Sequence, residues 1–195
     1  MGMYCHGMSV TDEHLDEMLR QRTREWWIDY KSKQVVTAKP KHVGWLERLF
    51  GGRPTEVQET LIELDQSRGE GVELDIDKAW SGLNFLLTGE VWASDFPTGF
   101  LVDGGRVLND DSKDFAVRGF RSEEAVEILN ALKAFDHETL KRRYDSQAFC
   151  DREVYPALNW SDADFEEYLW PYFRDLITFL ETCQNPQCGY TLLIG

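Results

Sequence analysis

The segment from Asp75 to Gly89 is the feature of the sequence that most constrains the fold. Its apolar residues recur at helical spacing and also fill most of the remaining circumference: Ile76, Ala79, Trp80, Leu83, Phe85, Leu86 and Leu87. A helix that is apolar on nearly every side has to be covered on several sides. Asp75 or Asp77 can cap its start, and Gly89 stands where a left-handed closing residue is expected. The segment therefore predicts a buried central helix over residues 77–88.

Turn, capping and periodicity signals along the rest of the chain predict an α+β fold. Strands are expected at residues 1–10, within 99–118 and at 190–194, and further helices at about 11–27, 55–68, 122–135 and 161–180. Within 99–118, Asp103-Gly-Gly is a turn signal between the short strands 100–102 and 106–108. Pro171 lies inside the last helix and deletes one backbone hydrogen bond, which predicts a kink or split there. We expect a single domain over residues 1–195, in which a small mixed sheet packs against four to five helices.

The acidic charge of the chain is unevenly distributed. The net charge is −14, of which residues 1–74 contribute −3 and residues 75–195 contribute −11. Such a surface repels nucleic acid phosphates and anionic lipid, so we expect no nucleic acid partner and no membrane contact. An acidic surface attracts a basic partner, or it serves solubility alone. Both interpretations stay open at this point.

One stretch has the opposite charge. Residues 20–53 hold nine basic and three acidic side chains, with Trp26, Trp27, Tyr30 and Trp45 among them. Aromatic and basic residues together can bind single-stranded nucleic acid. The preferred interpretation is a surface excursion whose charges pair with the acidic remainder of the molecule. We therefore expect a basic variable insertion at about residues 31–54.

Cysteine usage and hydropathy favour a cytoplasmic protein. The four cysteines are few and irregularly spaced, which favours reduced thiols. No apolar run reaches the roughly 18 residues that cross a bilayer, and the N-terminus lacks the pattern of a signal peptide. The pairs Asp75/Asp77 and Cys183/Cys188 supply too few ligands for a metal ion. We expect no metal and no cofactor.

Several short segments, taken in order, resemble the YfbM-like family of bacterial proteins, a domain-of-unknown-function group. The matching segments are 1–3, 75–80, 86–89, 124–126, 143–144, 154–156, 167–169 and 193–195. They span nearly the whole chain, and the basic stretch around 31–54 aligns least. The resemblance implies a single α+β domain and brings no established catalytic residues.

The candidate binding residues are aromatic side chains, one arginine and an acidic loop. Aromatic rings together with one guanidinium suit a cleft for a planar or anionic group, and carboxylates in a loop suit a basic partner. Trp80, Arg118 and Tyr155, with Tyr144 and Trp160, are candidates for the cleft, and Asp110, Asp111 and Asp114 form the loop. For Trp80, packing in the core is the stronger alternative.

The expected function is that of a non-enzymatic, cytoplasmic protein-binding module. One concrete form is an immunity- or antitoxin-like protein that sequesters a basic toxin. The sequence lacks the common hydrolase, metalloprotease, phosphate-binding and dinucleotide-binding motifs. The alternative is a small-molecule-binding enzyme, such as a hydrolase, with a cleft beside the central helix. A third interpretation is a housekeeping domain whose acidity has no binding role.

Overall fold

The centre of the molecule is a five-stranded sheet. The computed structural model describes residues 2–20, 25–29, 34–40, 57–92, 94–108, 116–156, 159–184 and 188–195. The strands are β1 (Cys5–Thr11), β5 (Glu73–Asp75), β6 (Arg106–Val107), β7 (Val117–Phe120) and β8 (Cys188–Ile194). Their order is β5-β1-β8-β7-β6, and every described pairing is antiparallel. The strands predicted at residues 1–10 and 190–194 are thus confirmed, and they are neighbours in the sheet.

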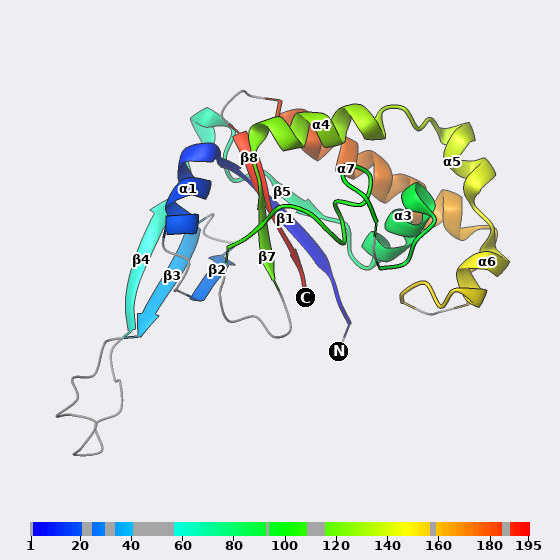
Figure 1. Ribbon diagram of the computed structural model, residues 1–195, viewed down its shortest axis with the longest axis horizontal. Coiled ribbons are helices and arrows are strands. Elements are labelled where there is room, and N and C mark those ends of the chain that lie inside the picture. Colours follow the sequence, from blue (N-terminus) through cyan, green and yellow to red (C-terminus); the bar gives the residue numbers. More distant parts are fainter. Residues whose placement is uncertain are drawn as a thin grey trace, which may run out of the picture.

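Helices cover this sheet and extend beyond it. They are α1 (Asp12–Arg20), α3 (Ala79–Thr88), α4 (Ser122–Leu132), α5 (His137–Arg143), α6 (Ser146–Asp151) and α7 (Trp170–Thr182). Helix α4 packs against β8 and α7, and α3 packs against α5 and against the π-helical turn η2 (Phe165–Leu169). Figure 1 shows α3, α5 and α6 gathered to one side of the sheet. The predicted single α+β architecture is confirmed, but the expected mixed sheet is wrong, since all described pairings are antiparallel.

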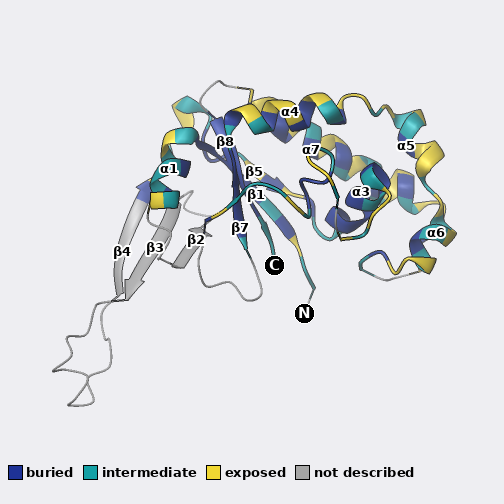
Figure 2. Cartoon of the chain, viewed as in Figure 1, coloured by how far each residue is buried: buried dark blue, intermediate teal, exposed yellow. Residues whose placement is uncertain are grey.

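The predicted central helix forms and is buried. Trp80 is 1% exposed, and the side chains that α3 buries belong to the same core as α4, η2 and α7. In Figure 2 the strands β7 and β8 are mostly buried, and buried segments alternate with exposed ones along α4. Each large apolar side chain contributes roughly 1.5–3 kcal/mol when fully buried. Gly89 closes the helix with a φ of 80°, as predicted.

The predicted cap of this helix is wrong. The helix begins at Ala79, and no side chain caps its first turn. Asp75 instead accepts a hydrogen bond from the backbone N–H of Asp77 at 2.8 Å. Asp77 itself has a φ of 47°, which is uncommon outside glycine and tolerated best by aspartate and asparagine. This turn directs the Asp77 side chain away from the helix end.

Glycine at position 82 brings α3 close to the last helical segment. A Cβ there would lie 2.7 Å from Leu169 Cδ2 and 3.1 Å from Trp160 Cη2. That last segment is split, as Pro171 predicts: residues 165–169 form a π-helical turn, and α7 begins at Trp170 with the proline in its first turn.

Two helix predictions in the first third of the chain are wrong. The helix expected over residues 11–27 ends at Arg20, and β2 (Glu25–Asp29) follows. The helix expected over 55–68 is the strand β4 (Val57–Glu63), which pairs with β3 (Gln34–Pro40). Cross-strand pairing with β3 outweighs the helical spacing of the apolar residues in this segment. Figure 1 shows this second sheet, β2-β3-β4, beside α1.

The predicted insertion lies partly in this second sheet. Residues 34–40 form β3, and the remainder of 31–54 lies outside the described residues. Its limits stay a prediction. Where the second sheet meets the first, Ile62 packs with Leu15 and Met18 of α1.

The predicted hairpin within 99–118 forms differently. Residues 106–107 are a strand, but they pair with β7, and residues 100–102 lie in a turn. Phe100 and Leu101 are buried there, and their carbonyl groups accept hydrogen bonds from the Arg118 guanidinium at 3.0 and 2.6 Å. These carbonyls therefore have a side-chain partner in place of a neighbouring strand.

Candidate functional site

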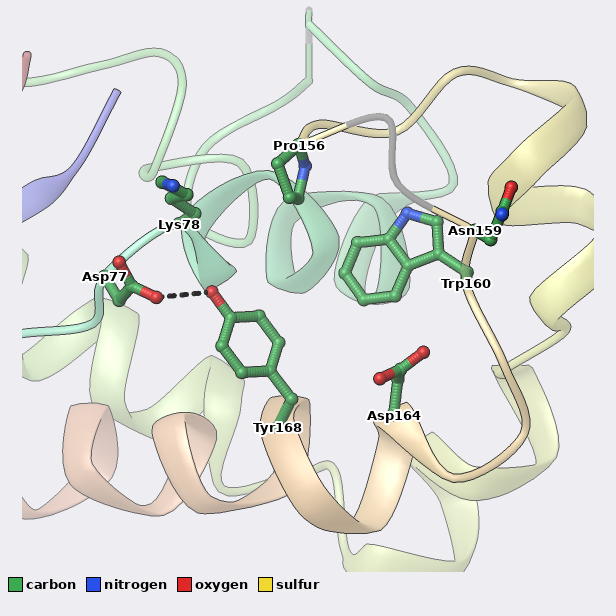
Figure 3. Close-up of a pocket in the computed structure, with 7 residues that line it drawn as sticks. All are labelled: Asp77, Lys78, Pro156, Asn159, Trp160, Asp164 and Tyr168. Carbon is green, nitrogen blue, oxygen red and sulfur yellow. Dashed lines mark hydrogen bonds between the residues drawn. The ribbon is translucent and has the colours of Figure 1, made fainter. Parts of the chain in front are cut away.

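A pocket opens beside the start of α3. Its volume is about 290 Å³, and it is lined by Asp77, Lys78, Pro156, Asn159, Trp160, Asp164 and Tyr168. Three separate segments supply these residues: the turn before α3, the loop after α6, and the start of the last helical segment. Figure 3 shows Asp164 and Tyr168 rising from one helix toward Pro156 and Trp160 on the opposite side.

The aromatic walls of the pocket are fixed by the core behind them. The centroids of the Trp160 and Tyr168 rings lie 6.4 Å apart, with their planes inclined at 51°. Trp160 is largely buried, and its indole N–H donates to the Val154 carbonyl at 3.0 Å. The Trp160 ring also lies against the space that Gly82 leaves open. A ligand in the pocket would therefore contact aromatic side chains that are already held in place.

Each of the two carboxylates in the pocket is anchored by one oxygen. Asp77 Oδ2 accepts from the Tyr168 hydroxyl at 2.9 Å, as Figure 3 shows. Asp164 Oδ2 accepts from the backbone N–H and the hydroxyl of Ser161, at 2.6 and 3.0 Å. No described residue donates a hydrogen bond to the Oδ1 atom of either carboxylate. Both groups are held in place while retaining an acceptor for a ligand.

The one cation among the lining residues lies at the edge of the pocket. Lys78 Nζ is 5.0 Å from the centroid of the Tyr4 ring, a cation–π distance. Figure 3 shows its ammonium group directed away from Asp164 and Trp160. The centre of the pocket therefore carries carboxylates and aromatic rings, with the lysine outside it.

The pKa values of two tyrosines near the pocket are raised by burial and by nearby carboxylates. Burial raises the pKa of Tyr168, and the adjacent Asp77 carboxylate raises it further. Burial likewise raises the pKa of Tyr172, with additional contributions from Asp77, Asp75 and Asp175. The contribution of these carboxylates to the local field, unlike that of burial, also favours a nearby cation. Tyr168 stays protonated at neutral pH and acts as a hydrogen-bond donor.

The surrounding chain adds to this field. Residues 151–175 contain seven acidic and two basic side chains. One of these acids is already paired: Glu166 contacts His137 Nε2 at 3.0 Å and Lys141 Nζ at 2.6 Å. These contacts raise the pKa of His137 and lower that of Glu166. The pocket carboxylates differ, since each keeps one oxygen without a described donor.

Three aromatic residues, Tyr4, Trp92 and Tyr155, are termed the aromatic rim, since each contacts Lys78 or Trp80 at the start of α3. Trp92 is 59% exposed and Tyr4 is 40% exposed, which is unusual for such large side chains. Trp80 lies beneath the rim, with its ring centroid 5.6 Å from that of Tyr155 and 5.9 Å from that of Trp92. Exposed aromatic residues beside a pocket are typical of protein interfaces.

The structure places the sequence-predicted site residues in three different environments. Trp80 is buried, and its indole N–H donates to the Met3 carbonyl at 3.2 Å. Tyr155 is half-buried next to the pocket, and its hydroxyl accepts from the Met3 N–H at 2.7 Å. Arg118 lies apart from both, on β7, where its guanidinium donates to backbone carbonyls. Asp110, Asp111 and Asp114 lie outside the described residues.

Of the two further cleft candidates, only one reaches the pocket. Trp160 forms its wall, whereas the Tyr144 hydroxyl donates to the Ser161 carbonyl at 2.7 Å. Sequence reasoning missed Tyr168. It favoured helix capping over metal binding for Asp77, and it placed Asp164 in a capping-box position three residues after Ser161, at the start of the last helix. The spacing of four residues between Asp164 and Tyr168 was an available signal, because it places both on one helical face.

A metal site needs several ligating side chains placed together, and a membrane span needs a long apolar helix; the described part of the chain has neither. Within it, no three His, Cys, Asp or Glu side chains are placed to hold one metal ion. No helix among these residues has both the length and the apolar character needed to cross a bilayer.

Comparisons with known proteins bear on the fold and the family. A family model described as a domain of unknown function, DUF1877, matches residues 1–190. Among solved structures, a protein of unknown function, YfbM from Escherichia coli, is 16% identical. The match covers 99% of this chain and 100% of that chain, with a TM-score of 0.61. No curated protein matches the chain. At this level of identity, the likeness to YfbM shows a shared fold.

Proposed function

The chain belongs to the DUF1877 family, and because that family is defined without an activity, we propose its function from the geometry of the pocket: the protein binds a basic protein partner. The family resemblance expected from the sequence is confirmed. The observation that carries the proposal is the pairing of two anchored carboxylates with a fixed aromatic wall. We propose that this pocket receives an arginine or lysine side chain of the partner.

The chemistry of the pocket matches a cationic side chain. Asp77 Oδ1 and Asp164 Oδ1 can accept hydrogen bonds from a guanidinium or ammonium group. Hydrogen bonds to charged groups contribute about 1.5–3 kcal/mol each. The face of Trp160 adds a cation–π contact of about 0.5–2 kcal/mol. Because the carboxylates and the ring are already held in place, little ordering is needed on binding.

The surface around the pocket supports a protein as the partner. The aromatic rim supplies contact area beside the pocket, where a polypeptide carrying the basic side chain would lie. The net charge of −11 over residues 75–195 would steer a basic protein toward this face and speed its capture. A cytoplasmic immunity- or antitoxin-like protein that sequesters a basic toxin is one concrete form of this function. In it, Asp110, Asp111 and Asp114 would extend the acidic surface.

A peptide titration tests the proposed pocket chemistry. We expect a short blocked peptide containing arginine to shift the NMR signals of Trp160 and Tyr168, with a Kd on the order of 1 mM. A peptide with citrulline in place of arginine keeps the shape and loses the charge, so it should bind at least about tenfold more weakly.

Variants of the pocket carboxylates complete this test. The double variant Asp77→Asn and Asp164→Asn should remove most of the arginine-dependent shift. Asparagine preserves the size of each side chain and can still accept the anchoring hydrogen bonds. The matched control, Glu167→Gln with Asp175→Asn, removes the same amount of charge from residues that do not line the pocket. Equal binding of the citrulline peptide, or equal losses in both double variants, would rule out the proposed capture of a cation.

The enzyme alternative also has one observation in its favour. The pocket lies beside α3, which is where a small-molecule cleft was expected. Asp77, Lys78 and Tyr168 would be its polar groups. Tyr168 retains its proton at neutral pH because its pKa is raised, so it is unsuited to act as a general base there. A small molecule that displaces the arginine peptide and is chemically altered by the protein would favour the enzyme.

A further inference from the structure

Two cysteines lie together where α7 ends and β8 begins. Cys183 immediately follows the last residue of α7, and Cys188 is the first residue of β8. Both are free thiols and both side chains are buried. Their sulfur atoms share one backbone acceptor, since Cys183 Sγ lies 3.7 Å and Cys188 Sγ 3.5 Å from the Gly189 carbonyl oxygen. The two thiols are close enough for each to shift the pKa of the other.

We propose that Cys183 and Cys188 form a reactive dithiol that hydrogen peroxide converts to an intramolecular disulfide. This proposal is independent of the pocket and of its partner. It names a small oxidant because burial of both side chains excludes bulky disulfide reagents. The disulfide would join the end of α7 covalently to the start of β8, the strand that pairs with both β1 and β7.

The environment assigns different roles to the two thiols. The neighbouring Cys183 thiol lowers the pKa of Cys188, because a donor beside the sulfur stabilises a thiolate and outweighs the opposing effect of burial. The same interaction, together with burial, raises the pKa of Cys183. Since the thiolate is the nucleophile, Cys188 is the residue that attacks peroxide. Cys183 then serves as the resolving thiol.

The proposed reaction balances in two steps. The Cys188 thiolate attacks one peroxide oxygen, the O–O bond breaks, and the departing hydroxide takes a proton to form water. Cys183 then attacks the sulfur of the resulting sulfenic acid, the S–S bond forms, and the S–O bond breaks. The proton from Cys183 completes a second water molecule. The dithiol loses two electrons and two protons, and peroxide is reduced to water.

The other two cysteines provide internal controls. Burial raises the pKa of Cys5 to about 12, so it remains a thiol at neutral pH. Cys150 is half-buried, and its sulfur lies 3.8 Å from the Trp160 carbonyl oxygen. Among the described residues, neither Cys5 nor Cys150 has another cysteine as a hydrogen-bond partner. Neither residue has the resolving partner that Cys188 has.

Mass spectrometry of the full chain after peroxide treatment tests this proposal. We expect a loss of two hydrogen atoms, located to a cross-linked peptide containing Cys183 and Cys188 and reversed by dithiothreitol. In the Cys183→Ser variant, Cys188 should stop at sulfenic acid, which dimedone traps when the peroxide-treated protein is unfolded in its presence. Cys5→Ser and Cys150→Ser should leave the yield of the disulfide unchanged.

Two outcomes would overturn the assignment. One is that Cys183 and Cys188 both remain available to alkylation after unfolding, under peroxide conditions that already oxidise Cys150. The other is that the cross-link joins a different pair of cysteines. Because the measurement follows covalent mass, it shows which thiols have reacted even in a variant that folds less well. Circular dichroism of the untreated variants identifies a variant with a folding defect.

Discussion

Replacing Glu70 with alanine is expected to lower the free energy of unfolding by about 3–5 kcal/mol. Glu70 is 1% exposed, and its carboxylate accepts from the backbone N–H groups of Thr11 at 2.6 Å and Asp65 at 2.7 Å. It also lies 2.7 Å from His14 Nδ1. One side chain thereby connects the end of β1, helix α1 and the segment after β4. Truncation leaves these donors without their acceptor, and each unsatisfied buried donor costs about 1–3 kcal/mol.

Urea denaturation followed by circular dichroism measures this effect. Glu73→Ala is a suitable control, because Glu73 is an exposed residue of β5 and should change the stability by no more than about 0.5 kcal/mol. Glu70→Gln retains an acceptor oxygen and should fall between the two. A loss below about 1 kcal/mol for Glu70→Ala would show that the carboxylate does not hold these segments together.

Substituting Gly189 with alanine is expected to cost about 3 kcal/mol or more, above the usual range for overpacking. A Cβ at this position would lie 2.1 Å from the Phe120 carbonyl oxygen and 3.0 Å from the Arg121 carbonyl carbon. These are backbone atoms at the end of β7, so no side-chain rotation can relieve the clash. Strand β8 would have to separate from its neighbour.

Gly89→Ala provides the matched control for this prediction. Gly89 has a φ of 80°, and a Cβ added there would meet nothing within 4 Å, so alanine costs only the strain of a left-handed conformation, about 1–2 kcal/mol. Thermal unfolding of both variants separates steric clash from backbone strain. Similar losses for the two would contradict the close approach of β8 to the end of β7.

The sequence predicted those elements whose local signals agree with their final environment. The helix over residues 77–88 is apolar on nearly all sides and is buried on nearly all sides, so its pattern and its packing coincide. The split at Pro171 follows from a missing backbone donor, which no tertiary contact can restore. By contrast, the segment 57–64 has apolar residues at helical spacing, at Val57, Leu61 and Leu64. The strand conformation of β4 depends on pairing with β3, a contact that local spacing does not encode.

The site was harder to predict because its residues come from distant segments. Asp77 and Asp164 are 87 positions apart by their numbering, and each has a local explanation as a capping residue. For Asp164 that explanation is correct but incomplete, since the cap occupies one oxygen and the pocket receives the other. For Arg118, by contrast, the site prediction fails and the structure shows a structural role. Its grouping with aromatic candidates predicted a ligand site, whereas the guanidinium donates to the carbonyl groups of a buried turn.

Affinity purification from the native host tests the central claim, the capture of a basic protein, most directly. The full chain serves as bait at low and moderate salt, alongside the Asp77→Asn/Asp164→Asn variant and a variant with Asn at positions 110, 111 and 114. We expect one basic protein that is retained by the wild type and by the charge-matched control Glu167→Gln/Asp175→Asn, and lost from the pocket variant. Recovery of a small ligand with no accompanying protein would contradict it.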